Sequence, residues 1–181
     1  MQKHTRQRLI FTISIVALVF LFNGTPSSSA PQYLRGVYEN GAIAYVGPLT
    51  IQQTNAYKQF IYSKKTEKEK LYYLLSRFRT ADHLGFYFGG GRYSANDACF
   101  GSGWILRHRY KGNKEARKFI REQVTFFEKP GKPLLIEFQN GSIHFAYNII
   151  INELELLENT IAETSATDFI ADLTPGTELL H

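Results

Sequence analysis

Apolar side chains recur every three or four positions in three stretches of the chain, which is the spacing of one helix face. The first stretch follows Thr66-x-x-Glu69, a capping-box pattern whose side chains can satisfy free backbone N–H groups of the first turn. The second runs from Asn113, a suitable N-cap, to about residue 128, and the third lies near the C-terminal end. We therefore expect three amphipathic helices. Their apolar faces hold Leu71, Leu74, Leu75 and Phe78; Ala116, Phe119, Ile120, Val124 and Phe127; and Ile150, Leu154, Leu157 and Ile161.

Two other stretches have the pattern of β-hairpins. Residues 33–46 and 134–147 place β-branched and aromatic residues on both sides of an Asn-Gly pair. The pairs are Asn40-Gly41 and Asn140-Gly141. Asn-Gly suits a type I′ turn because both residues tolerate a positive φ, and we expect that turn at Asn40-Gly41.

The middle of the chain is less regular. Residues 85–91 (GFYFGGG) interrupt the helical pattern, because three consecutive glycines cost too much backbone entropy inside a helix. Ser94-x-x-Asp97 is typical of a further helix start, with the helix running towards Tyr110, although Gly101 and Gly103 weaken the pattern. Residues 49–62 show no clean period. The sequence thus predicts an α+β fold, a small single domain of about four helices with short antiparallel β-hairpins.

The first 30 residues have the pattern of a secretory signal peptide. A short basic region precedes the uncharged apolar run Leu9–Phe22, whose 14 residues are few for a spanning helix, and small polar residues follow. We expect export to the periplasm with cleavage near Ser29-Ala30; the alternative is an uncleaved segment that anchors the protein in the inner membrane. The expected organisation is a signal peptide at 1–30, a hairpin and connector at 31–63, an α+β core at 64–163 and a polar tail at 164–181.

Composition and charge narrow the class of protein without indicating a reaction. Of 181 residues, 44% are hydrophobic and 20% charged, which excludes a disordered chain, and the single Cys99 excludes an intramolecular disulfide framework. Residues 58–132 carry 17 basic and 7 acidic side chains, whereas residues 133–181 carry 8 acidic ones and no Lys or Arg. This asymmetry indicates either a basic surface for an acidic partner or two halves that neutralise each other, and we favour the second reading.

Short motifs occur in a fixed order across residues 70–158. They are Tyr73-Leu74-Leu75, Phe86, Gly91, Tyr93-Ser94-Ala95, Ala98, Glu115-Ala116-x-x-Phe119-Ile120, Gly131-Lys132-Pro133, Asn140-Gly141 and a closing Leu-rich helix. This order resembles that of the YfeK-like group of small exported bacterial proteins of unknown function. The resemblance implies an envelope location and an α+β domain, and no reaction. This chain departs from the family pattern at residues 126–130, where members carry a Ser-rich stretch.

The main functional hypothesis is a non-enzymatic binding or interaction module of the envelope, with no cofactor and no nucleic acid as partner. Aromatic residues flank the glycine run and are able to line a ligand groove or to pack a core. We expect the contact surface around that run, at Arg79, Asp82, Arg92 and Tyr93. Gly89-Gly90-Gly91-Arg92 also has the makings of an anion-binding backbone nest, although a flexible turn explains it as well.

An envelope hydrolase is the competing hypothesis. It would use Asp82 or His83 as acid or base, or Cys99 as nucleophile with His108 nine residues later. A buried, inert Cys is the commoner state, and a free thiol in an oxidising compartment is also able to form an intermolecular disulfide. His83, His108 and His144 are far apart in the sequence and lack metal-ligand spacing, so no metal site is predicted.

Basic residues also recur at helical spacing on the predicted helix after Asn113. Lys114, Arg117, Lys118 and Arg121 are neighbours on one face. Such a face suits a protein or an anionic envelope component such as a polymer or lipid headgroup. A solvated helix surface is the simpler interpretation, and we favour it.

Overall fold

Four short strands and a set of helices make up the part of the chain that the computed structural model describes, residues 33–127 and 132–173. The strands are β1 (Gly85–Phe88), β2 (Gly91–Tyr93), β3 (Leu135–Glu137) and β4 (Ile143–Phe145). The helices are α2 (Asn55–Ile61), α3 (Glu67–Arg79), α4 (Ala95–Arg109), α5 (Ala116–Phe127) and α6 (Ala146–Leu173), with a 3-10 turn η1 at Ile51–Gln53. The predicted α+β class is confirmed. The additional helix is α2, which lies in the stretch without a clean period.

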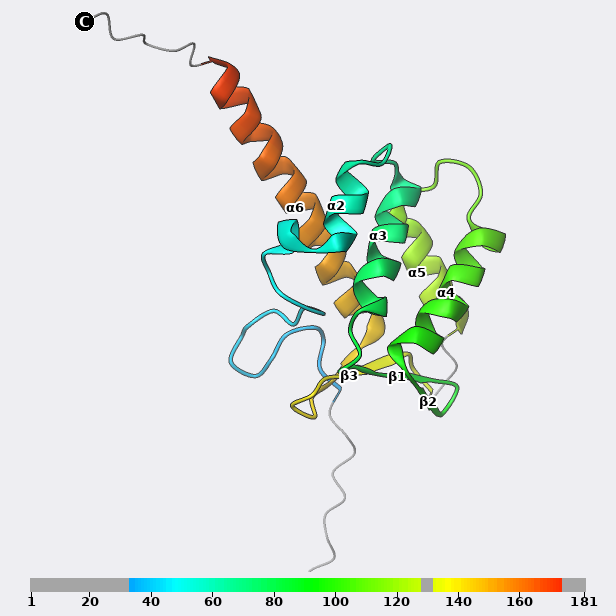
Figure 1. Ribbon diagram of the computed structural model, residues 1–181. Coiled ribbons are helices and arrows are strands. Elements are labelled where there is room, and N and C mark those ends of the chain that lie inside the picture. Colours follow the sequence, from blue (N-terminus) through cyan, green and yellow to red (C-terminus); the bar gives the residue numbers. More distant parts are fainter. Residues whose placement is uncertain (1–32, 128–131, 174–181) are drawn as a thin grey trace, which may run out of the picture. The chain divides into compact units, whose positions relative to one another are not determined.

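The strands form one antiparallel sheet in the order β2-β1-β3-β4, and the helices gather on one of its faces (Figure 1). Phe86 pairs with Ile136, which pairs with His144, so these three side chains share a face. Ile136 and His144 are fully or almost fully buried, which identifies this as the face towards the helices. Tyr87 and Leu135 alternate with them and lie on the other face.

The turn at Asn40-Gly41 differs from the prediction. Gly41 has a φ of 81°, but Asn40 keeps a negative φ, so the turn is not type I′. Instead the Gly41 N–H donates to the Tyr38 carbonyl. The Tyr38 N–H donates to the Ala42 carbonyl. This is the pattern of a type I turn followed by a left-handed glycine. The two consecutive positive φ values of a type I′ turn occur at Gly89-Gly90, between β1 and β2.

Helix starts follow the predicted caps in two cases and differ in a third. The Thr66 and Ser94 side chains accept the N–H groups of Glu69 and Asp97, as their capping patterns indicate. Asn113 is not a cap: α5 begins at Ala116, whose N–H donates to Glu67 Oε2 over 2.7 Å. The cap of α5 therefore comes from the first turn of α3, 49 residues earlier.

The last helix and the N-terminal segment complete one shared core. Leu154 and Leu157 on α6 are fully buried, as the apolar seam predicts. The helix continues to Leu173, into the region where we expected a polar tail. Ala44 and Val46, from the segment assigned to a hairpin and connector, are buried in the same core as α3 and α6. That segment is therefore part of the domain.

Candidate functional site

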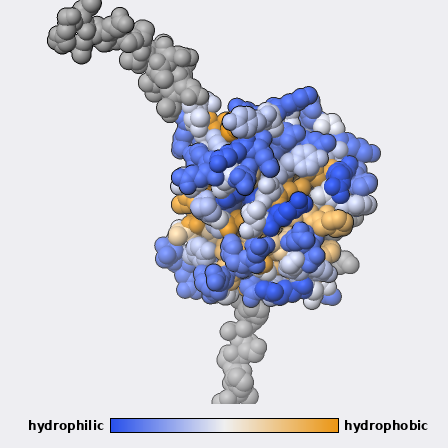
Figure 2. Space-filling model, in the orientation of Figure 1, coloured by the Kyte–Doolittle hydropathy of each residue, from blue (hydrophilic) through white to orange (hydrophobic). Residues whose placement is uncertain are grey.

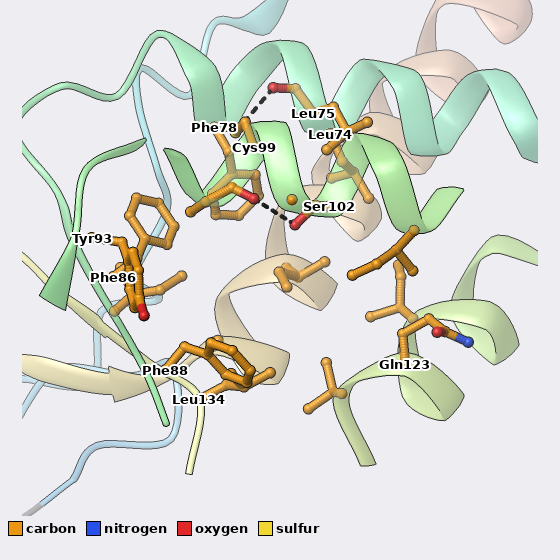
Figure 3. A pocket seen from close by; sticks show the side chains of 18 of the residues that line it. Leu74, Leu75, Phe78, Phe86, Phe88, Tyr93, Cys99, Ser102, Gln123 and Leu134 are labelled. Atoms are coloured by element: carbon orange, nitrogen blue, oxygen red, sulfur yellow. Dashed lines mark hydrogen bonds between the residues drawn. The ribbon is translucent and has the colours of Figure 1, made fainter. Parts of the chain in front are cut away.

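A cavity of about 420 Å³ lies between α3, α4, α5 and the helix-facing side of the sheet. Its walls are almost entirely apolar. Figure 3 shows Phe86, Phe88 and Tyr93 on one side and Leu74 and Leu75 on the other. A cavity of this size and composition falls within the range of small-molecule sites, which span roughly 300–1,000 Å³.

Small side chains on α4 create the space. Ala98, Gly101, Ser102 and Ile105 line the cavity, and their spacing of 3, 1 and 3 places them on one helix face. The first three have little or no side-chain volume, so this part of α4 leaves room at the cavity. α4 packs along α3, and α5 packs along α6. Helices α4 and α5 thus form two walls of the cavity.

Three polar side chains at the cavity, those of Asp97, Ser102 and Gln123, have hydrogen-bond partners on the protein. The Ser102 hydroxyl donates to the Ala98 carbonyl over 2.9 Å, the usual bond of a serine to its own helix (Figure 3). Gln123 Oε1 accepts a 3.4 Å hydrogen bond from Arg109, which joins α5 to α4 beside the cavity. Asp97, which is exposed, accepts from the Ser94 hydroxyl. A ligand inside the cavity therefore meets mainly carbon.

Cys99 lines this cavity and is buried, with 3% of its surface exposed. Burial raises the pKa of its thiol to about 11, although Arg79 acts in the opposite direction. The Cys99 thiol donates to the Leu75 carbonyl, with 3.6 Å between Sγ and the oxygen. At neutral pH the group is a protonated thiol inside an apolar wall. This position suits packing and gives no support to a nucleophile or to an intermolecular disulfide.

The hydrolase residues are not brought together. Asp82 and His83 are exposed in the turn after α3, and neither lines the cavity with Cys99. The His108 ring stacks on Trp104 with ring centroids 4.3 Å apart, and its Nδ1 lies 2.7 Å from the Trp104 carbonyl. His108 is thus held on the exposed side of α4.

The four residues predicted as a contact surface separate into different places. Tyr93 lines the cavity. Arg92, its neighbour on β2, points to the other face of the sheet, where its Nε donates to Glu137 Oε2 over 3.1 Å. Arg79 and Asp82 are exposed and do not line the cavity. Of the predicted surface, only Tyr93 belongs to this site.

Glu137 holds the Arg92 guanidinium in a small network on the outer face of the sheet. The Tyr87 hydroxyl donates to the same carboxylate oxygen at 3.0 Å. These two hydrogen bonds, from Tyr87 and from Arg92, hold the pKa of the Glu137 carboxyl below its usual range. Since the guanidinium is engaged here, the anion nest at Gly89-Gly90-Gly91-Arg92 loses the cation that would complete it.

Ion pairs account for much of the predicted basic face. Arg117 contacts Glu155 at 2.9 Å and Glu158 at 3.5 Å, and Lys114 pairs with Glu122. Arg121 donates to the Tyr147 hydroxyl at 3.4 Å, and Lys118 is exposed. The pairs of Arg117 with Glu155 and Glu158 join the basic part of the chain, residues 58–132, to the acidic part, residues 133–181.

Three further ion pairs join the basic part of the chain to the acidic part. They are Lys70 with Glu158, Arg77 with Glu153, and Arg92 with Glu137. The charge asymmetry of the sequence is therefore neutralised at least partly within the fold, in agreement with the reading that we favoured.

Among the side chains of residues 33–125 and 132–166, no group of three or more His, Cys, Asp and Glu is arranged to hold a metal ion. Over residues 33–127 and 132–173 no helix combines the length and the apolarity that crossing a membrane requires. The apolar run Leu9–Phe22 lies outside the described part of the chain.

Fold and site define an α+β domain with an apolar cavity. No protein-family model matches the chain, and no curated protein or solved structure is significantly similar to it.

Sequence reasoning missed the cavity. The signal was present in the small residues of the 94–110 helix. Gly101 was weighed only as a residue that weakens a helix, whereas Ala98, Gly101 and Ser102 together keep one helix face free of side-chain volume.

Proposed function

We propose that the protein is a non-enzymatic binding protein of the bacterial cell envelope and that its cavity holds the hydrocarbon chain of a lipid-like molecule. The main support for this proposal is the cavity itself, which is large and apolar. The polar side chains of Asp97, Ser102 and Gln123 at its border have hydrogen-bond partners on the protein. The signal-peptide pattern of residues 1–30 supports an envelope location.

The size of the cavity supports a chain-like ligand. A cavity of about 150 Å³ in another protein holds one benzene molecule, so each carbon atom takes roughly 25 Å³. The same ratio applied to about 420 Å³ gives room for roughly 17 carbon atoms. Burying a methylene group is favourable by about 0.8 kcal/mol, so affinity should increase with chain length until the cavity is full.

The alternatives receive less support from the described residues. A hydrolase using Asp82, His83 or Cys99 would need these side chains in one cleft, and only Cys99 lines the cavity. A membrane-anchored structural protein depends on the apolar run Leu9–Phe22, which lies outside the described part of the chain.

A competition experiment tests the proposal. The protein is titrated with an uncharged naphthylamine dye whose fluorescence rises in apolar surroundings, and saturated fatty acids of 6 to 18 carbons then displace it. Affinity should rise with chain length and level off. Ser102→Phe places a ring at the cavity and should weaken binding at least about fivefold, because overpacking a filled site costs about 1–3 kcal/mol.

Asn96→Phe is the matched control, since Asn96 lies exposed on the same helix and does not line the cavity. It should bind the dye as the original chain does. Equal dye binding by both variants, or displacement that is indifferent to chain length, would refute the proposal.

A further inference from the structure

The outward face of α4 carries two large exposed aromatic side chains beside the cavity. Phe100 is 71% exposed and Trp104 is 49% exposed, and their spacing of four residues places them on one helix face. Figure 2 shows apolar surface among polar side chains over this helix. Phe100 stands next to Gly101 and one turn from Asp97, both of which line the cavity. We call Phe100 and Trp104 the α4 aromatic pair.

Positive charge accompanies this pair. Residues 98–114 contain no Asp or Glu. Arg107 is exposed and continues the face of the aromatic pair on α4, and Lys111 is exposed just beyond the end of the helix. Among the side chains of residues 33–125 and 132–166 no ion pair involves Arg107 or Lys111. The C-terminal end of α4 therefore presents aromatic rings and nearby cations without ion-pair partners.

We infer that this face docks on the surface of an anionic lipid bilayer. Trp favours the interface between lipid and water because its ring is amphipathic, and Phe buries an apolar ring at the boundary of the hydrocarbon. Each cation near an anionic leaflet strengthens binding roughly fivefold. Phe100 lies next to Gly101 and one turn from Asp97, and both of these residues line the cavity, so a hydrocarbon chain would have a short path from the bilayer to the cavity. Docking on a membrane goes beyond the proposed function. Only the purpose of docking, which is transfer of the ligand, rests on the proposed function.

The test uses a chain that begins at Pro31, because the apolar run Leu9–Phe22 would bind membranes by itself. Residues 33–181 form a compact unit with their own core, so this chain should fold. Trp104 is the only tryptophan, and its emission therefore reports on α4 alone. Vesicles of phosphatidylglycerol and phosphatidylethanolamine are titrated in, with phosphatidylcholine vesicles in parallel.

We expect the Trp104 emission to shift to shorter wavelength with the anionic vesicles and much less with phosphatidylcholine. Phe100→Ser should weaken this binding roughly tenfold, which corresponds to removing one partly buried aromatic side chain from the lipid. Arg107→Gln with Lys111→Gln should weaken it by roughly 25-fold at low salt, and higher salt should reduce that difference.

Tyr62→Ser is the matched control, because Tyr62 is 91% exposed and lies at the end of α2, outside the aromatic pair. It should bind vesicles as the original chain does. An unshifted Trp104 emission, or equal loss in the Tyr62 and Phe100 variants, would overturn the inference. A change from dimer to monomer on Phe100→Ser, seen in a sedimentation experiment without lipid, would overturn it in favour of a second copy of this chain.

Failure of docking and failure of the cavity proposal are distinguishable. Phe100→Ser should keep its affinity for the naphthylamine dye, since Phe100 does not line the cavity. Conversely, Ser102→Phe should lose dye binding and keep vesicle binding.

Discussion

Arg77 Nε lies 3.1 Å from Glu153 Oε2, and both side chains are buried, with 4% and 0% of their surface exposed. The other carboxylate oxygen of Glu153 accepts the Val46 N–H, and the Arg77 guanidinium donates to the Pro48 carbonyl. The pair therefore joins α3, α6 and the N-terminal segment. A buried ion pair costs much to desolvate, but removing one partner costs more, because a charge is left alone in the core.

Glu153→Ala should lower the free energy of unfolding by about 3–5 kcal/mol, because it leaves Arg77 buried without a counter-charge. Urea denaturation measures this. Glu155→Ala is the control: Glu155 pairs with Arg117 at the surface, where such a pair contributes about 0–1 kcal/mol. Equal losses in the two variants would contradict the structural role of the buried pair.

Glu67 should stabilise the domain by capping α5. Its carboxylate accepts the Ala116 N–H and pairs with Lys70 at 2.7 Å. Burial opposes ionisation, but these two partners outweigh it and hold the pKa of the Glu67 carboxyl below its usual value. Glu67→Ala should cost about 1–2 kcal/mol of stability, the range for loss of a helix cap.

The effect of Glu67 should also depend on pH in a defined direction. Its contribution is present above the pKa of an unfolded Glu, about 4.3, and is lost as the pH falls through the lower folded pKa. Glu39→Ala is the control, because Glu39 is exposed and lies outside the helices. A thermal melt at pH 7 that finds the two variants equally stable would show that Glu67 does not cap α5.

His144 should make the domain less stable in mild acid. Its Nδ1 accepts the Gly36 N–H at 3.1 Å, which requires a neutral ring with the proton on Nε2, 3.3 Å from the Ser142 hydroxyl. Burial lowers the pKa of the His144 imidazole. Below pH 6.5 the unfolded chain therefore binds more protons than the folded one, and the free energy of unfolding decreases as the pH falls towards the folded pKa.

Urea titrations between pH 7.5 and pH 5 measure this dependence. The slope of the free energy of unfolding against pH should be reduced in His144→Gln. It should be retained in His83→Gln, because His83 is exposed. Parallel slopes in all three proteins would show that His144 does not carry the acid sensitivity.

Cys99 should react slowly with thiol reagents. With a pKa of about 11, its thiolate fraction at pH 8 is at least about 100-fold below that of a free cysteine, and burial restricts access further. We expect slow labelling in buffer, rapid labelling in urea, and further protection by a bound fatty acid. Rapid labelling of the folded protein at pH 8 would contradict a closed apolar wall at this position.

Local patterns predicted the elements well because caps and apolar spacing act over a few residues. Thr66 and Ser94 cap the helices that their sequences indicate. Features that depend on distant residues were not predictable. Glu67 caps a helix that begins 49 residues later. Glu153, which is not among the apolar residues of its helix face, is buried because Arg77 from another helix pairs with it.

The candidate site was only partly predictable for the same reason. Tyr93 was named among the expected contact residues and does line the cavity. Its neighbour Arg92 was not separable from it by sequence, because which face each points to depends on the sheet register that pairs β1 with β2. A cavity is an absence of side-chain volume among five or more elements, and no single stretch of sequence records it.

The mass of the protein purified from its own cells, measured under native and then denaturing conditions, tests the central claim most directly. The account predicts a native adduct with the mass of a single-chain or larger lipid, which is lost on denaturation and is strongly reduced in Ser102→Phe but not in Asn96→Phe. A native mass without any adduct, or an adduct retained equally by Ser102→Phe, would contradict the proposal that the cavity holds a hydrocarbon chain.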